Sequence, residues 1–245
     1  MGVAVEIDES GAWVAPRVVR GVDRACAPDA LDLGCEGDVA LGPDFARSSL
    51  RAKRGLDLLG AALGLLALAP LLGVIAVAIK LDGGGTIFYR QQRVGRYGRR
   101  FRMLKFRTMI PDADAGKEAL RGLNEAGGGL FKIAEDPRVT RVGRWLRRSA
   151  LDELPQLLNV LKGEMSLVGP RPLVLDEDAR IAGAHRRRLE LMPGMTGPWQ
   201  IVGPVRTSLQ EMAAIDYRYV ADWSLRRDLA ILLRTVPHVL GRRGL

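Results

Sequence analysis

The stretch Leu58–Ile79, LLGAALGLLALAPLLGVIAVAI, is 22 residues long and contains no charged side chain. As a straight helix it would be about 33 Å long, enough to cross the hydrocarbon core of a bilayer. A buried core helix is the alternative, but a helix this long with no polar face is rarely buried in a domain of this size. Because no second apolar run of this length occurs, the sequence predicts a single membrane segment.

Pro70 stands near the middle of this segment. Because proline lacks an amide donor and its ring clashes with the preceding turn, it should kink or break the helix. Each half would then be about 14 to 18 Å long, too short to span a bilayer alone. Basic residues flank both ends, and such residues resist export. We therefore expect residues 51–80 to form a re-entrant membrane helix, broken at Pro70, that enters and leaves on the cytoplasmic side.

The charge is distributed unevenly along the chain, whose formal net charge is +9. Residues 1–50 carry a net charge of −5 and residues 51–245 a net charge of +14. The positive excess requires an anionic partner, which could be nucleic acid, lipid headgroups or a phosphorylated substrate. Residues 1–50 show no sustained periodicity and no secretory signal, so we interpret them as a mobile N-terminal extension.

Several functional classes are excluded by composition. Cys26 and Cys35 are the only cysteines and the chain has two histidines, so a disulfide scaffold, a cysteine-rich zinc domain and a multi-histidine metal site are not expected. Aromatic residues make up 5% of the chain, which argues against a platform for stacking nucleic-acid bases.

The rest of the chain, residues 81–245, has a mixed pattern and predicts an α/β (α+β) fold, mainly helical and compact, with a short sheet and the re-entrant helix as its anchor. The C-terminal segment presents a row of apolar residues with arginines elsewhere, so it either lies among lipid headgroups or packs on the core. That row is Leu225, Leu229, Leu232 and Val236.

The predicted elements are strands at Thr86–Tyr89 and Arg100–Lys105 with a turn at Gly95 and Gly98, helices at Asp114–Leu123, Val142–Arg148, Ala150–Lys162, Leu209–Val220 and Leu225–Leu240 (capped by Ser224), a loop at Gly127–Gly129 and a turn at Met192–Gly197.

An adjacent carboxylate pair, Asp152 and Glu153, follows Arg147. A carboxylate can attack an activated phosphoryl or glycosyl centre, and its neighbour can hold a divalent cation that neutralises phosphate oxygens. Because Pro155 is tolerated only in the first turn of a helix, the pair should lie at a helix N-terminus, where the dipole favours anions. The alternative is helix capping, since Ser149 and Asp152 have the spacing of a capping box.

Basic residues in two other motifs suggest phosphate binding. Arg171 lies between two prolines in Gly169–Pro172, and a guanidinium whose backbone is restricted in this way suits bidentate contact with phosphate. Lys105 and Arg107 end a predicted strand. The alternatives are a rigid turn whose arginine faces water and a solvated basic edge. Taken together, the motifs indicate an acidic pair and several cations gathered beside a membrane.

These motifs, in their order along the chain, resemble the bacterial sugar transferase family of monotopic phosphoglycosyl transferases. The resemblance runs from about Lys53 to Leu240. It is carried by Lys53-Arg54, Asp57, Lys80-Leu81, Gln91–Gly95, Lys105–Met109, Asp136–Thr140, Gly143-Arg144, Ser149–Leu157, Asn159-Val160, Gly163, Met165–Pro172, Pro193-Gly194, Thr196-Gly197, Trp199-Gln200 and Asp222–Leu225.

The resemblance implies a two-step transfer. Asp152 would attack the sugar-linked phosphate of a UDP-sugar and release UMP, and polyprenyl (undecaprenyl) phosphate would then take the phosphosugar. This would begin the assembly of an exopolysaccharide, capsule, O-antigen or glycoprotein glycan. It further implies Mg²⁺ held by Asp152 and Glu153, and phosphate binding by Lys105, Arg107, Arg147 and Arg171.

The resemblance also implies a location and partners. Residues 81–245 would be a cytoplasmic catalytic domain with amphipathic interface helices, held monotopically at the cytoplasmic face of the bacterial inner membrane and in contact with its lipid. A homodimer is left open. Departures from the family pattern leave the transferred sugar open as well: no proline follows the membrane helix in Gly83–Thr86, Pro198 replaces the usual leucine, and Gly203-Pro204 replaces Gly-Arg, where Arg206 could substitute.

Two other functional classes are alternatives to an enzyme. A membrane-tethered nucleic-acid binder should show a recognised reader motif and a basic stripe free of acidic pairs, and neither occurs, so we expect no nucleic-acid partner. A catalytically idle membrane scaffold of the same fold should lack the acidic pair or the Gly-Pro-Arg-Pro turn, and both are present.

Overall fold

The computed structural model describes residues 3–4, 17–18, 47–83, 85–111, 113, 122, 133, 136–202 and 208–240. The chain divides into two units, Met1–Ala46 and Arg47–Leu245. In the first unit, β1 (Val3–Ala4) pairs antiparallel with β2 (Arg17–Val18). The predicted mobility of the N-terminal extension, the helix at 114–123 and the loop at 127–129 fall almost entirely outside the described residues.

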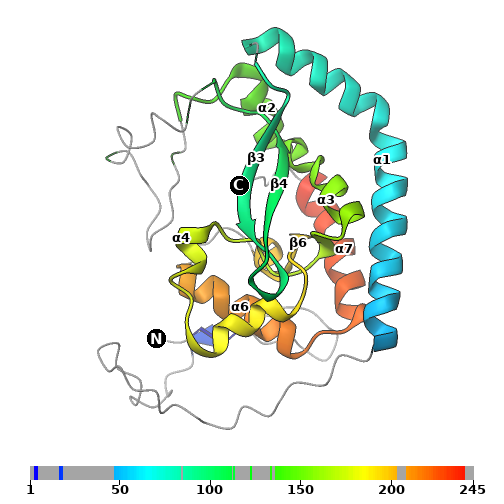
Figure 1. The fold of residues 1–245 in the computed structure, drawn as a ribbon, viewed down its shortest axis with the longest axis vertical. Helices are drawn as coiled ribbons and strands as arrows, with labels where there is room; N and C mark the ends of the chain where they lie inside the picture. The colour runs from blue at the N-terminus through cyan, green and yellow to red at the C-terminus, as the bar shows by residue number, and fades with distance from the viewer. Residues whose placement is uncertain are drawn as a thin grey trace. The chain divides into compact units, whose positions relative to one another are not determined.

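The uncharged stretch lies within α1 (Arg47–Gly83), a helix of 37 residues. Figure 1 shows α1 running along one side of the second unit and changing direction towards its C-terminal end. Pro70 lies inside α1, and a proline removes one helical hydrogen bond, which is a common cause of bends. The expectation of a helix over 51–80 broken at Pro70 is therefore corrected to a longer helix that bends, because the hydrogen-bond ladder continues on both sides of one missing bond.

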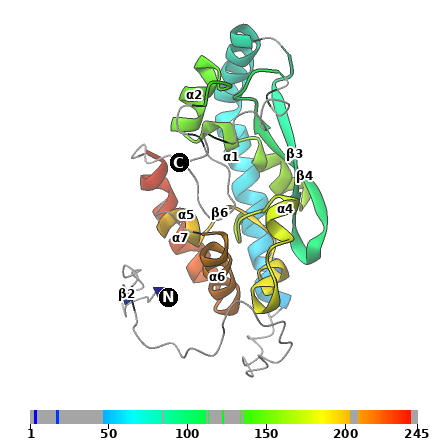
Figure 2. The same cartoon turned by 90° about the vertical axis from the view of Figure 1, so that its left-hand side faces the viewer.

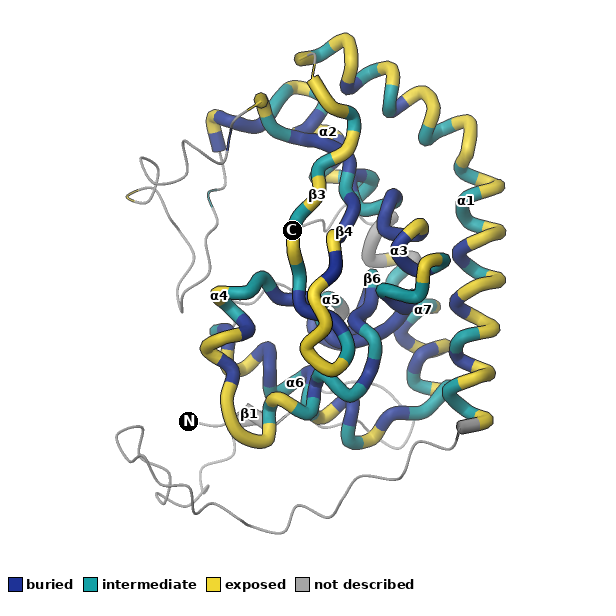
Figure 3. The backbone as a smooth tube through the Cα atoms, viewed as in Figure 1, coloured by how far each residue is buried: buried dark blue, intermediate teal, exposed yellow. Residues whose placement is uncertain are grey.

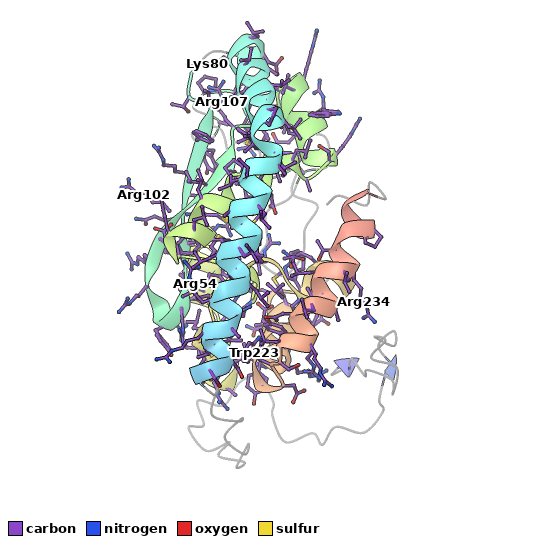
Figure 4. The ribbon with its side chains drawn as sticks, turned by 90° about the vertical axis from the view of Figure 1, so that its right-hand side faces the viewer. Arg54, Lys80, Arg102, Arg107, Trp223 and Arg234 are labelled. Atoms are coloured by element: carbon purple, nitrogen blue, oxygen red, sulfur yellow. The ribbon has the colours of Figure 1, made fainter. Side chains whose placement is uncertain are left out.

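Polar side chains near the start of α1 fasten it to the rest of the unit (Figure 4). Lys53 is buried and donates to the Val168 carbonyl at 2.8 Å and to Asp228 Oδ2 at 2.6 Å. Asp57 accepts from the Ser166 hydroxyl at 3.0 Å, and Arg54 donates to the Val160 carbonyl at 2.7 Å. The charged residues that precede the apolar stretch thus anchor the helix inside the fold.

The apolar outer surface of α1 is exposed along much of the helix, as Figure 3 shows. Leu59, Leu63, Leu66, Val74 and Val77 are among its exposed large side chains. Among the residues that the structure describes, α1 is the one helix long and apolar enough to cross a membrane. A continuous exposed row of aliphatic side chains is unfavourable in water and favourable in lipid.

The strands β3 (Phe88–Val94) and β4 (Arg100–Phe106) form an antiparallel hairpin. The short 3₁₀ turn Arg96–Gly98 joins them, and Gly98 there has a positive φ of 76°. Both predicted strands are confirmed, although β3 begins and ends later than expected. Tyr89 pairs with Lys105 and Arg93 with Phe101, so the alternation of strand side chains places Arg93 and Lys105 on the same face.

The predicted basic helix is confirmed as α2 (Arg141–Arg148). The segment after it, predicted as one helix over Ala150–Lys162, is two elements. A 3₁₀ turn, Leu151–Glu153, precedes α3 (Gln156–Lys162). Ala150 has a left-handed φ of 54° and Pro155 is the N-cap of α3. The prediction of one long helix was wrong because the left-handed Ala150 separates the turn from α2 and Pro155 separates the turn from α3.

The region predicted as a turn around Pro193 contains a strand, β6 (Gly194–Thr196), which pairs in parallel with β5 (Ser166–Val168). The expected short sheet is therefore a set of separate two-stranded sheets. A side chain on Gly169 would overlap the Met192 carbonyl, and one on Gly194 would overlap the Gly169 backbone. Only glycine permits this close approach, which sets the path of the chain entering Pro170.

The remaining helices are α4 (Leu175–Asp178), the 3₁₀ helix η4 (Gly183–Glu190), α5 (Pro198–Val202), α6 (Leu209–Ala221) and α7 (Leu225–Leu240). Figure 2 shows α5, α6 and α7 together on one side of the second unit, with the hairpin on another. Ser208 caps α6 and the Ser224 hydroxyl accepts from the Arg227 amide at 3.3 Å, so both predicted C-terminal helices are confirmed.

The buried face of α7 differs from the predicted row of leucines. Asp228 and Ile231 are buried, whereas Leu229 and Leu233 are exposed. The carboxylate of Asp228 accepts hydrogen bonds from Lys53, Tyr219 and Trp223, and these bonds turn Asp228 inward. One face of α7 therefore packs on the core and another presents leucines outward.

Candidate active site

The carboxylate pair lies in the 3₁₀ turn between α2 and α3, with Ala150 in the left-handed region just before it. A left-handed alanine costs about 1–2 kcal/mol, and such strain is characteristic of functional sites. Ser149 is the C-cap of α2, and its hydroxyl donates to the Trp145 carbonyl at 2.9 Å. Ser149 therefore closes the preceding helix, so the capping-box alternative for Asp152 was wrong.

Glu153 is held by the hairpin. Lys105 Nζ on β4 lies 2.5 Å from Glu153 Oε1 and forms both a hydrogen bond and an ion pair with it. Burial raises the pKa of Glu153, but the charge and hydrogen bond of Lys105, with the charges of Arg171 and Arg93, outweigh burial and hold that pKa below its ordinary value. Glu153 is therefore ionised at neutral pH and stably placed.

The environment of Asp152 differs from that of Glu153. Asp152 is buried, with 9% of its surface exposed. Among the residues the structure describes, no side chain donates a hydrogen bond to its carboxylate. Burial, assisted by the charge of Glu153, raises the pKa of Asp152 to about 6, while Lys105 and Arg147 act against that rise. A carboxylate that is ionised near neutral pH and not engaged by side-chain donors is suited to nucleophilic attack.

Arg147 reaches this region from the last turn of α2. Its Nε donates to the Thr108 hydroxyl at 2.9 Å, and its charge acts on Asp152. Gly143 permits the approach of α2, because a side chain there would overlap the Thr108 carbonyl. Arg147 is thus brought to the acidic pair by helix packing that only glycine allows.

Two further guanidinium groups complete the basic side of the site. Arg171 lies over the ring of Trp199, with Cζ 4.2 Å from the ring centroid. Arg93 donates to the Pro172 carbonyl at 2.9 Å, and burial together with the charge of Arg171 lowers the pKa of Arg93 to about 10. Cations from the hairpin and from the Gly-Pro-Arg-Pro segment therefore converge on Glu153.

Of the predicted residues, Asp152, Glu153, Lys105, Arg147 and Arg171 are brought together by these contacts and charges. The structure places Arg107 at the C-terminal end of α1, where its Nη2 donates to the Ile79 carbonyl at 3.5 Å and where Figure 4 shows it near Lys80. Its role in phosphate binding stays a prediction.

Sequence reasoning did not include Arg93 or Trp199 among the site residues. The signal for Arg93 was available: strand alternation and the hairpin register place it on the face of Lys105. No comparable local signal points to Trp199, because its contact with Arg171 depends on how α5 packs.

The acidic pair supplies few ligands for a metal ion by itself. Within the described ranges, no group of three or more histidine, cysteine, aspartate or glutamate residues is arranged to hold one. Two carboxylates suit Mg²⁺ when phosphate oxygens of a substrate and water complete its six ligands. Asp152 and Glu153 therefore fit a cation shared with a phosphorylated substrate.

Comparison with known proteins identifies the family of this chain. The family model described as bacterial sugar transferase matches residues 48–242. The galactosyl transferase CpsE of Streptococcus agalactiae is 45% identical over 201 residues, which cover 80% of this chain and 44% of that protein. The exopolysaccharide production protein ExoY of Rhizobium meliloti is 44% identical over 197 residues, covering 79% of this chain and 87% of that one.

A third relative has a more explicit name. The UDP-glucose:undecaprenyl-phosphate glucose-1-phosphate transferase of Caulobacter vibrioides is 42% identical over 236 residues, covering 86% of this chain and 83% of that protein. The chain thus spans less than half of CpsE but most of the two shorter relatives. The match to the family model covers most of the chain, and the chain belongs to the bacterial sugar transferase family of enzymes.

Proposed function

We propose that this protein transfers a phosphosugar from a UDP-sugar to polyprenyl phosphate, the undecaprenyl form in bacteria, and releases UMP. The product would start an exopolysaccharide, capsule, O-antigen or glycoprotein glycan. The observation that carries the proposal is the contrast within the pair: Asp152 is buried and accepts no hydrogen bond from a side chain that the structure describes, while the adjacent Glu153 is held by Lys105. The name of the Caulobacter relative supports the same donor and acceptor classes.

In the first step, an oxygen of Asp152 attacks the phosphorus that carries the sugar. The new bond joins the carboxylate oxygen to phosphorus, the bridging phosphorus–oxygen bond breaks, and UMP leaves with the electron pair. In the second step, an oxygen of polyprenyl phosphate attacks the same phosphorus and restores the Asp152 carboxylate. The products are a polyprenyl diphosphate sugar and the free enzyme.

The other residues bind charge and orient it. Lys105, Arg171 and Arg93 surround Glu153, and a diphosphate placed there would receive hydrogen bonds from their cationic groups. Arg147 favours the ionised form of Asp152. We propose that Asp152 and Glu153 hold Mg²⁺ when the donor is bound, and that the ion neutralises charge on the phosphate oxygens.

We also propose that α1 is re-entrant and holds the enzyme at the cytoplasmic face of the inner membrane. The bend, the exposed aliphatic surface and the basic residues at both ends of the helix support this arrangement. It would let the basic unit meet a membrane-bound anionic acceptor at the headgroup plane.

The function is tested with membranes that contain the protein, polyprenyl phosphate, Mg²⁺ and a panel of UDP-sugars. We expect release of UMP with at least one sugar and loss of that release when Mg²⁺ is chelated. A membrane preparation containing Asp152→Asn is the matched control. Failure to release UMP with any donor in the panel would contradict the proposal.

Cys26 and Cys35 provide a test of topology, because both precede α1 and lie outside the described residues. An impermeant thiol reagent should leave them unlabelled in intact spheroplasts and label them after permeabilisation. Labelling in intact spheroplasts would place the N-terminal segment outside and make α1 a spanning helix.

A further inference from the structure

We propose that the buried ion pair Arg188–Asp216 positions Arg171 for catalysis, through the Arg171 backbone. This inference rests on the proposed function of the site. Arg188 belongs to η4 and Asp216 to α6, both distant in sequence from the acidic pair. The ion pair Arg188–Asp216 would therefore position Arg171 from outside the catalytic motifs.

Both backbone polar groups of Arg171, its amide and its carbonyl, are hydrogen-bonded to the ion pair. Its amide donates to Asp216 Oδ2 at 3.0 Å, and its carbonyl accepts a hydrogen bond from Arg188 Nη2. Arg188 Nη2 in turn donates to the same oxygen of Asp216 at 2.9 Å. One ion pair thus engages both the donor and the acceptor of a single residue.

The side chain of Arg171 is constrained as well. Pro170 and Pro172 restrict the backbone on either side, and the guanidinium lies over the Trp199 ring at 4.2 Å. With the backbone clamped and one face of the guanidinium covered, its hydrogen-bonding edge has few orientations left. This matters because misplacing a catalytic group by about 1 Å can cost about a hundredfold in rate.

The burial of Arg188 and Asp216 indicates that this ion pair does more than link η4 to α6. Asp216 is 0% exposed and Arg188 is 1% exposed, so both charges have been removed from water. Such a pair is often no more stabilising than apolar residues of similar size. The pair therefore adds little to stability by itself, but the Asp216 carboxylate accepts from the Arg171 amide and the Arg188 guanidinium donates to the Arg171 carbonyl.

The test is a double-mutant cycle on UMP release measured against UDP-sugar concentration. Asp216→Asn should lower kcat/KM about tenfold or more in the wild-type background, because the asparagine side chain lacks the negative charge that holds Arg188. In an Arg171→Lys background the same substitution should lower kcat/KM less than twofold, because the residue that it positions is already altered. Equal factors in both backgrounds would overturn the inference.

Asp178→Asn is the matched control. Asp178 Oδ1 lies 3.6 Å from Arg188 Nη1, and the residue makes no described bond to Arg171. We expect kcat/KM within twofold of wild type for this variant. A loss equal to that of Asp216→Asn would assign the effect to packing around Arg188 and overturn the positioning role.

The variant Arg188→Met/Asp216→Leu separates positioning from folding, since it replaces both charges with apolar side chains. We expect a cooperative melting transition somewhat below that of wild type, because the Arg171 amide and carbonyl lose their partners, and a kcat/KM as low as that of Arg171→Lys. Wild-type activity in this folded variant would contradict the inference. Because every arm uses UMP release by the wild type as its reference, absence of that release would instead refute the proposed function.

Discussion

Asp152 and Asp216 are both nearly excluded from solvent, and burial raises the pKa of each, yet the molecule surrounds them differently. Asp216 accepts hydrogen bonds from the Arg171 amide and from Arg188. Asp152 receives none from the described side chains and follows a left-handed alanine. Burial alone therefore does not define a reactive carboxylate. A carboxylate engaged by side-chain and backbone donors from distant segments holds its neighbours in place, and one without side-chain donors is free to attack.

The largest expected effect comes from the unengaged carboxylate. Asp152→Asn should lower acceptor-independent UMP release by about a thousandfold or more, because an amide is a far weaker nucleophile than a carboxylate. The rate is measured in a single turnover with UDP-sugar and Mg²⁺. Near-wild-type release would remove the covalent role from Asp152 and end its contrast with Asp216.

Arg171 links the two aspartates, so its substitution tests whether the clamp serves the site. Arg171→Lys should lower kcat/KM about 10- to 100-fold while the protein stays folded, because an ammonium does not reproduce the bidentate guanidinium. Steady-state kinetics and a melting curve measure the two quantities. Activity within twofold of wild type would make Arg171 part of a rigid turn only.

The pH profile should report Asp152 and not Asp216. Because the pKa of Asp152 is about 6 and only the ionised form attacks, kcat/KM should fall about tenfold per pH unit below pH 6. Asp216→Asn should lower the plateau and leave the midpoint near 6. A midpoint below pH 5 in the wild type would contradict the unengaged environment assigned to Asp152.

The smallest effect concerns stability. The folded-state pKa of Asp152, about 6, lies above its ordinary value of 3.8, so ionising this residue opposes folding as pH rises through that window. Asp152→Asn should therefore raise the free energy of unfolding by at most about 3 kcal/mol at pH 8, and by about half as much at pH 5. Unfolding curves at both pH values measure this, and a destabilised variant at pH 8 would contradict it.

Local patterns in the sequence were sufficient for α1, for the hairpin and for most of the charged site. The apolar stretch, the strand alternation and the motif around Asp152 each involve neighbouring residues, and in each case the structure contains the expected element or cluster. Pro70 bends the helix and does not break it, because one lost hydrogen bond leaves the rest of the ladder intact.

Features that depend on distant partners could not be predicted in this way. The inward turn of Asp228 depends on Lys53, 175 positions away, and the clamp on Arg171 depends on Asp216, 45 positions away. The left-handed Ala150 also escaped prediction, because alanine is ordinarily a helix former and nothing in the neighbouring residues marks it for that conformation.

The central claim is that Asp152 becomes covalently bonded to a phosphosugar. Intact-protein mass spectrometry after acid quench, with UDP-sugar and Mg²⁺ but no acceptor, tests it most directly. We predict a mass increase equal to one sugar phosphate, mapped to the peptide containing Asp152, removed by added polyprenyl phosphate and absent from Asp152→Asn. No adduct in a wild-type protein that releases UMP, or an adduct that persists in Asp152→Asn, would contradict the account.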